Sequence, residues 1–173
     1  MSRLGPPPGG LTPFDHVPEV WAAFNRYYGT LWSEGVVDQP TKEVGRLRNA
    51  RVTGCGICKN LRFEGATASG LTEDHVDEIT DSYVDSDLSD RWKLTIRLAD
   101  ALISDPASVR STLGDQLDEE FGPDELVELV ATITTAIAFS KAAVAFGAPE
   151  EMPTMSVPTP TVDGTVDDAL PSA

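Results

Sequence analysis

Cysteine, histidine and basic residues are scarce in this sequence. Of its 173 residues two are Cys, two are His and 13 are Lys or Arg, against 28 Asp and Glu, so the formal net charge is −15. A strongly acidic chain repels phosphate groups at long range, so we expect no nucleic-acid partner and no anionic membrane surface as a partner. Two cysteines are also too few for the disulfide framework of a small secreted domain.

The beginning of the sequence lacks the apolar run that a secretory signal requires. It carries one Arg and then a segment of Gly and Pro, residues 5–10. We therefore expect a cytoplasmic protein. A structural metal site needs about four ligands, and besides the cysteines the chain offers only His16 and His75. The sequence thus predicts neither a metal nor another bound cofactor.

Both ends of the chain differ in composition from its middle. Residues 1–13 hold four prolines and three glycines, and residues 149–173 hold five prolines, five acids and no Lys or Arg. Such segments sustain neither a helix nor a central strand. We expect a flexible N-terminal arm, one helical domain over residues 14–148, and an acidic tail. Each end is then either disordered or an extended arm that lies on a partner subunit.

The middle of the chain shows the spacing of amphipathic helices. Apolar residues recur at steps of three and four, and Pro, Gly and capping residues separate the segments. No strand-like alternation or internal repeat is evident, so the predicted class is all-α. We expect helices at about residues 18–34, 40–52, 55–68, 72–83, 89–103, 106–121 and 124–146.

The last predicted helix, residues 124–146, is apolar on almost every side. A helix of this kind is buried in a core or between subunits. Its length would nearly span a bilayer, but Glu128, Lys141 and a group of threonines argue against a membrane span.

Cys55 and Cys58 form the strongest chemical pattern in the sequence, Gly-Cys-Gly-Ile-Cys. Thiols at positions i and i+3 lie on the same side of a helical turn, close enough to form a disulfide. A helix that begins just after Gly54 would favour a thiolate at its N-terminus, and by this reasoning Cys55 would be the more reactive thiol. The alternatives are a pair of buried apolar side chains or metal ligands shared between subunits.

Charge is distributed unevenly around the cysteines. Residues 41–62 contain six basic side chains and one acid, Glu43, whereas residues 72–90 contain eight acids and no Lys or Arg. A basic neighbourhood lowers the pKa of a thiol. The two segments could equally well neutralise each other across a pair of helices. Glu43 could exchange protons with a thiol or form a surface ion pair with Arg46 or Lys42.

The spacing of Glu43, eleven residues, Cys55, two residues, Cys58 and then position 62 resembles the carboxymuconolactone decarboxylase-like superfamily, most closely its alkylhydroperoxidase D branch. The flanking segments, residues 18–35, 70–73, 91–94 and 121–129, are similar as well, so the likeness covers about residues 14–148. It implies a helical fold that assembles as a dimer, trimer or hexamer.

The resemblance also implies roles for the site residues. Cys58 would attack the peroxide, Cys55 would resolve the product to a disulfide, and Glu43 would belong to the proton relay. The histidine that the branch has four residues after the second cysteine is Arg62 here. A guanidinium stays protonated and cannot relay a proton at neutral pH, although it can hold a thiolate or pair with Glu43. His75 is a possible substitute from the next helix.

We therefore predict a thiol-dependent oxidoreductase that reduces a small peroxide and is returned to its reduced state by a dithiol partner. Two alternatives stay open. The chain could be a lyase or isomerase that acts on a small acid or lactone through Glu43 and Arg62. It could also be a redox-responsive oligomeric protein without catalytic turnover.

Overall fold

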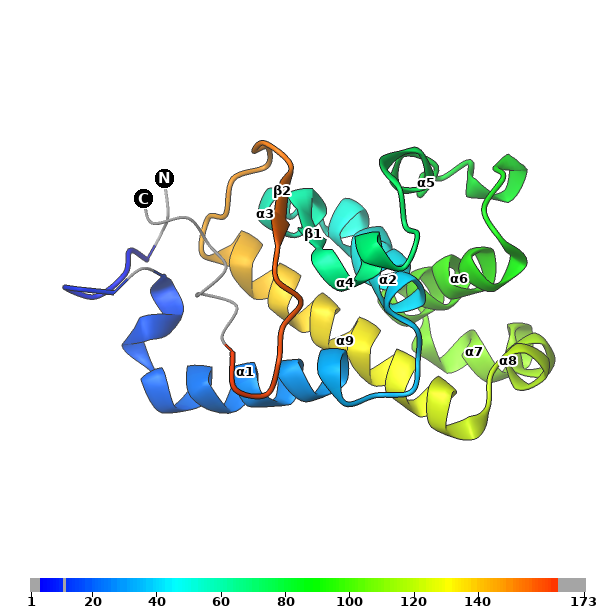
Figure 1. Cartoon of the computed structure of the whole chain (residues 1–173), viewed down its shortest axis with the longest axis horizontal. Coiled ribbons are helices and arrows are strands. Elements are labelled where there is room, and N and C mark those ends of the chain that lie inside the picture. Colours follow the sequence, from blue (N-terminus) through cyan, green and yellow to red (C-terminus); the bar gives the residue numbers. More distant parts are fainter. Residues whose placement is uncertain (1–3, 11, 165–173) are drawn as a thin grey trace.

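The structure, a computed structural model, describes residues 4–10 and 12–164 (Figure 1). In chain order its elements are η1 (Pro13–His16), α1 (Pro18–Ser33), α2 (Gln39–Thr53), α3 (Gly56–Asn60), β1 (Leu61–Phe63), α4 (Glu64–Ala68), α5 (Glu73–Asp77), η2 (Tyr83–Asp85), α6 (Asp90–Ser104), η3 (Pro106–Ser108), α7 (Val109–Thr112), α8 (Gly114–Glu120), α9 (Pro123–Ala145) and β2 (Met155–Val157).

Helix α2 is the centre of the fold and packs against both α6 and α9. Its first turn is capped by Asp38, whose carboxylate accepts a hydrogen bond from the Thr41 backbone N–H at 2.9 Å. The helix ends at Gly54, which adopts a left-handed φ of 69° that favours glycine. Local chemistry thus sets both ends of α2, close to the predicted limits of residues 40–52.

The main core lies where α6, α8 and α9 meet. Helices α6 and α9 agree closely with the predicted helices at residues 89–103 and 124–146, and the all-α class is confirmed apart from a two-stranded sheet. The core side chains interdigitate and remove apolar surface from water. They are Val37, Leu94, Leu98, Ala99, Leu113, Leu117, Phe121, Leu129 and Ile133.

Three of the shorter predicted helices are wrong in extent. The segment predicted as one helix over residues 55–68 is divided into α3, β1 and α4 because residues 61–63 pair with β2. The helix predicted over residues 72–83 stops at Asp77. The helix predicted over residues 106–121 breaks at Leu113, whose φ of −125° and ψ of −11° lie outside helical geometry.

The second half of the sheet comes from the segment expected to be a flexible tail. Strand β2 pairs in parallel with β1, with Leu61 opposite Met155 and Phe63 opposite Val157. Residues 149–164, orange and red in Figure 1, therefore pack against helices and β1 of the same chain. Sequence reasoning missed this because the pairing joins residues about 94 positions apart. Residues 1–3, 11 and 165–173 of the predicted arm and tail lie outside the described residues.

Contacts on both sides of β2 hold this C-terminal strap, residues 149–164, to the helices. The Gly56 backbone N–H donates to the Pro149 carbonyl at 3.0 Å, and the Gly65 N–H donates to the Thr159 hydroxyl at 2.8 Å. At Gly29 of α1 an added Cβ would lie 2.1 Å from the Thr161 carbonyl oxygen. Glycine is required there because the strap backbone approaches the helix closely.

Replacing Gly29→Ala is therefore expected to detach the end of the strap. Alanine favours a helix by about 1 kcal/mol over glycine, so without the strap the change would stabilise α1. We expect faster hydrogen exchange in peptides that cover residues 155–162, measured by mass spectrometry. Gly5→Ala is the control because its Cβ meets nothing within 4 Å. Unchanged exchange together with a higher melting temperature would contradict the strap packing.

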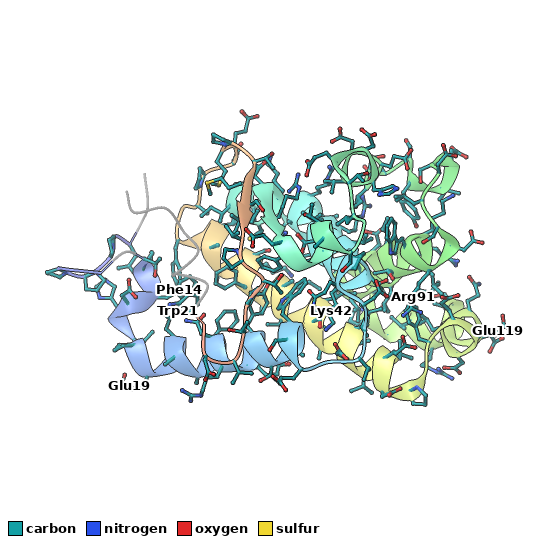
Figure 2. All side chains as sticks on the ribbon, viewed as in Figure 1. Phe14, Glu19, Trp21, Lys42, Arg91 and Glu119 are labelled. Atoms are coloured by element: carbon teal, nitrogen blue, oxygen red, sulfur yellow. The ribbon has the colours of Figure 1, made fainter. Side chains whose placement is uncertain are left out.

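A buried ion pair joins α1, α2 and α9. The Lys42 side chain, 1% exposed, lies 2.5 Å from the Glu128 carboxylate and donates to the Leu31 carbonyl at 2.6 Å (Figure 2). Glu128 also accepts the backbone N–H of Val36 at 2.6 Å. A charge at this depth requires such compensation, so the pair orders the loop between α1 and α2.

Glu128→Ala should destabilise the protein by about 3–5 kcal/mol because the Lys42 charge would stay buried without its partner. Urea unfolding followed by circular dichroism measures the loss. Glu119→Ala on the exposed face of α8 is the control and should leave the unfolding midpoint nearly unchanged. Equal midpoints for the two variants would show that the buried pair does not stabilise the fold.

Within the described residues, α9 is the one helix long and apolar enough to cross a membrane by length and composition. In the fold it packs against α1, α2 and α6. Its buried face carries Leu129, Ile133 and Ala136, while Val127 and Val144 are exposed. The helix is therefore partly buried within the fold.

Candidate active site

The two cysteines meet at the start of α3. Cys55 is the N-cap residue, and its sulfur accepts a hydrogen bond from the Cys58 backbone N–H at 3.3 Å. Both are free thiols, with Cys55 fully buried and Cys58 5% exposed. The turn predicted from the Cys-x-x-Cys spacing therefore brings the sulfurs together.

The two thiols differ in acidity. A hydrogen bond from the Cys55 thiol lowers the pKa of Cys58; burial opposes this, and a hydrogen bond from Ser140 and the charge of Arg46 reinforce it. The same bond to Cys58, together with burial, raises the pKa of Cys55. Cys58 is thus the thiol that ionises first.

The expectation from the helix dipole, that Cys55 would be the more reactive thiol, is wrong. The helix that follows Cys55 has five residues, so its dipole is small. Cys55 is buried and donates its proton toward Cys58, and both effects favour its neutral form.

Arg46 is the cation that lies beside this thiol pair. Its guanidinium forms two hydrogen bonds of 2.7 Å with the Glu43 carboxylate, and the remaining N–H groups donate to the carbonyls of Cys58 at 2.6 Å and Leu61 at 2.7 Å. Glu43 in turn accepts the Phe63 backbone N–H at 3.3 Å. The pair, buried on α2, therefore holds α3 and β1 in place.

Glu43 forms an ion pair with Arg46, but this pair is buried and does not lie on the surface. Glu43 is fully buried, and Arg46 links it to the backbone of Cys58. Glu43 reaches the cysteines through this guanidinium.

Arg62, the other residue predicted for the site, points elsewhere. It forms hydrogen bonds of 2.8 and 3.1 Å with Glu73 and donates to the Lys59 carbonyl at 2.8 Å. His75 Nδ1 accepts the backbone N–H of Thr72, the N-cap of α5, at 3.2 Å, and its ring packs edge-on against Trp92. The structure therefore brings neither residue to the sulfurs.

Two of the six basic residues, Arg48 and Arg62, pair with acids of residues 72–90, so the two charged segments balance each other in part. Arg48 pairs with Asp81 at 2.9 Å and with Asp100 at 2.6 Å, and Arg62 pairs with Glu73 at 2.8 Å. Asp81 and Glu73 belong to the acidic segment at residues 72–90. Of the six basic residues, Arg46 is the one that faces the thiols.

A cavity of about 310 Å³ opens beside Cys58. Its wall is mainly aromatic, and Phe14 lies 4.6 Å from Trp21 and 5.3 Å from Phe139, measured between ring centroids (Figure 2). Cys58 lines the cavity, whereas Cys55 is not among the described residues of its wall. The aromatic residues of the wall are Phe14, Trp21, Phe24, Tyr28, Phe63, Phe139 and Phe146.

The polar groups at this cavity are few. Ser140 of α9 and Arg46 of α2 line it near Cys58, and so does Tyr28, whose pKa is raised by burial. Sequence reasoning did not assign Ser140 or the aromatic wall to the site. Their signal is weak, because all of them except Phe63 lie far from the cysteines along the chain.

For the part of the chain that the structure describes, no group of three or more His, Cys, Asp and Glu side chains is arranged to hold a metal ion. The chemistry available at the site is that of a thiolate, a second thiol and hydrogen-bond donors in an apolar cavity.

Comparison with known proteins agrees with this architecture. The family model for the carboxymuconolactone decarboxylase family matches residues 18–101. A crystal structure of a protein of unknown function from Agrobacterium tumefaciens, suggested to be the antioxidant defence protein AhpD, superposes with a TM-score of 0.67 at 16% identity. The match covers 82% of this chain and 97% of that chain. These findings define a helical protein of the AhpD-like fold.

Residues 18–101 therefore carry the sequence pattern of the carboxymuconolactone decarboxylase family. Uncharacterized proteins of Mycobacterium tuberculosis strains CDC 1551 and H37Rv are each 34% identical to it over 140 residues. The match covers 80% of this chain and 49% of theirs, so the chain spans about half the length of these relatives.

The unequal acidity of the thiols predicts how alkylation depends on pH. The thiolate is the reactive form, so the rate at each cysteine rises as the pH passes through its pKa. Cys58 should reach half of its maximal rate near pH 7, and Cys55 only at higher pH. Mass spectrometry after brief iodoacetamide treatment resolves the two sites. In the unfolded control both should titrate near ~8.5. The same value for both in the folded protein would contradict the asymmetry.

Proposed function

We propose that this protein is a thiol-dependent oxidoreductase that reduces peroxides through a dithiol and disulfide cycle of Cys58 and Cys55. The observation that carries the proposal is the asymmetry of the pair. Cys58 lines the apolar cavity and has the lowered pKa, while Cys55 lies behind it within hydrogen-bond reach.

The cycle begins with the Cys58 thiolate, which attacks one oxygen of the hydroperoxide R–O–O–H. An S–O bond forms and the O–O bond breaks, so Cys58 becomes a sulfenic acid and the alkoxide leaves as R–OH after taking up a proton. The Cys55 sulfur then attacks the Cys58 sulfur, and the disulfide forms as water leaves. An external dithiol reduces this disulfide by thiol exchange and is itself oxidised to a disulfide.

The surroundings of the sulfurs support this chemistry. Arg46 and Ser140 stabilise a thiolate at Cys58. The Cys55 thiol lies close to the Cys58 sulfur, with which it later forms the disulfide. The apolar wall suits a substrate with a hydrocarbon group. The small-molecule peroxide, the dithiol reductant, a homo-oligomeric assembly and a cytoplasmic location are parts of the same proposal.

The lyase or isomerase alternative receives no support from a particular observation. An unpaired cation in the binding site would favour a small acid substrate. Arg46 is the one charged side chain among the described residues of the cavity wall, and Glu43 neutralises it.

Hydroperoxide consumption with dithiothreitol as donor tests the proposal. Cys58→Ser should lower the rate to that of dithiothreitol alone. Without dithiothreitol, Cys55→Ser should consume one equivalent of hydroperoxide and leave a sulfenic acid at Cys58, detected by dimedone labelling and mass spectrometry. The parent rate should rise with pH through the pKa of Cys58 because the thiolate is the nucleophile. A Cys58→Ser variant as fast as the parent would overturn the proposal.

A further inference from the structure

Two buried polar side chains, Asn49 of α2 and Ser140 of α9, are hydrogen-bonded to each other beside the cavity that Cys58 lines. Asn49 of α2 is fully buried, and its amide nitrogen Nδ2 donates to the Ser140 hydroxyl oxygen of α9 at 2.9 Å. Ser140 is 1% exposed and lines the cavity together with Cys58 of α3. Because Ser140 accepts from Asn49, its own proton is available for another acceptor.

The direction of the Ser140 hydroxyl is unusual for a helix. Serine and threonine in helices often donate to the carbonyl four residues earlier. Thr134 on the same helix does so, donating to the Val130 carbonyl at 2.8 Å. Among the hydrogen bonds of the described residues, the Ser140 hydroxyl accepts from Asn49 and makes no such bond to the Ala136 carbonyl. Its proton is therefore free to turn toward the cavity wall that Ser140 shares with Cys58.

We propose that Ser140 is a catalytic residue that donates a hydrogen bond to the Cys58 thiolate, and that Asn49 is the positioning residue that turns the Ser140 proton toward the sulfur. The inference rests on the proposed function for its role in turnover. The hydrogen-bond chain itself concerns the thiolate and can be measured without any peroxide. Through Ser140, helix α9 takes a direct part in the chemistry.

The amide of Asn49 decides the direction of the whole chain. A donor at this position leaves the hydroxyl proton for the sulfur, whereas an acceptor would draw that proton away from it. Asn49→Asp is therefore a sharp test, since a carboxylate of nearly the same shape can only accept. The Asn49 amide oxygen has no partner within the described part of the chain, so the contact with Ser140 is the one that fixes its side chain there.

Alkylation of Cys58 as a function of pH, resolved by mass spectrometry, tests the inference in the full chain. Ser140→Ala should raise the pKa of Cys58 by about one, so that alkylation at pH 7 slows about fivefold while the rate at pH 9.5 stays near that of the parent. Asn49→Asp should shift the pKa in the same direction. Ser140→Thr keeps a hydroxyl and should restore the parent profile.

Thr132→Val is the matched control. Thr132 is a fully buried hydroxyl residue of α9 whose oxygen has no hydrogen-bond partner among the described residues, so its loss should leave the profile of Cys58 unchanged. Near-ultraviolet circular dichroism checks that each variant is folded. If Ser140→Ala does not fold, Asn49→Asp carries the test alone.

Two outcomes overturn the inference: a parent-like pKa of Cys58 in folded Ser140→Ala, or an unchanged or lowered pKa in Asn49→Asp. A shifted pKa in a protein that consumes no peroxide supports the hydrogen-bond chain and refutes the proposed function. If the variants keep the parent pKa of Cys58 and the parent consumes peroxide, the hydrogen-bond chain is refuted and the proposed function is supported.

Discussion

The buried guanidinium of Arg46 is the interaction on which the site depends. It satisfies the Glu43 carboxylate and at the same time binds the carbonyls of Cys58 and Leu61. A charge in the interior requires complete pairing, so the helix that carries it and the segment that supplies the carbonyls can adopt only one relative position. This constraint places α3 and β1 on α2 and sets Cys58 at the edge of the cavity.

The asymmetry of the two sulfurs follows from their surroundings. Both belong to one turn, yet the neighbouring Cys58 and burial raise the pKa of Cys55, while the Cys55 thiol, Ser140 and Arg46 lower the pKa of Cys58. Aromatic side chains from η1, α1, β1 and α9 line the cavity beside this sulfur. Donors close to the sulfur, in a cavity with little polar surface, stabilise a thiolate that water would otherwise solvate.

The candidate site could be predicted in part. Cys55, Cys58 and Glu43 were found because their spacing is local and their chemistry is distinctive. Arg62 was assigned by position, but β1 is a strand, so its side chain points away from Leu61 and Phe63 and toward Glu73. Ser140, Asn49 and the aromatic wall were missed because hydrogen bonds between helices leave no periodic signal in a single sequence.

Local patterns along the chain suffice to predict the helical class, the limits of α2, α6 and α9, and the meeting of two thiols at one turn, because apolar periodicity, capping residues and i, i+3 spacing act over a few residues. Contacts between distant segments establish which thiol is acidic, which arginine lies beside it, and that residues 155–157 complete a sheet with residues 61–63. These features depend on burial and on partners distant along the chain. Local rules carry no information about such distances.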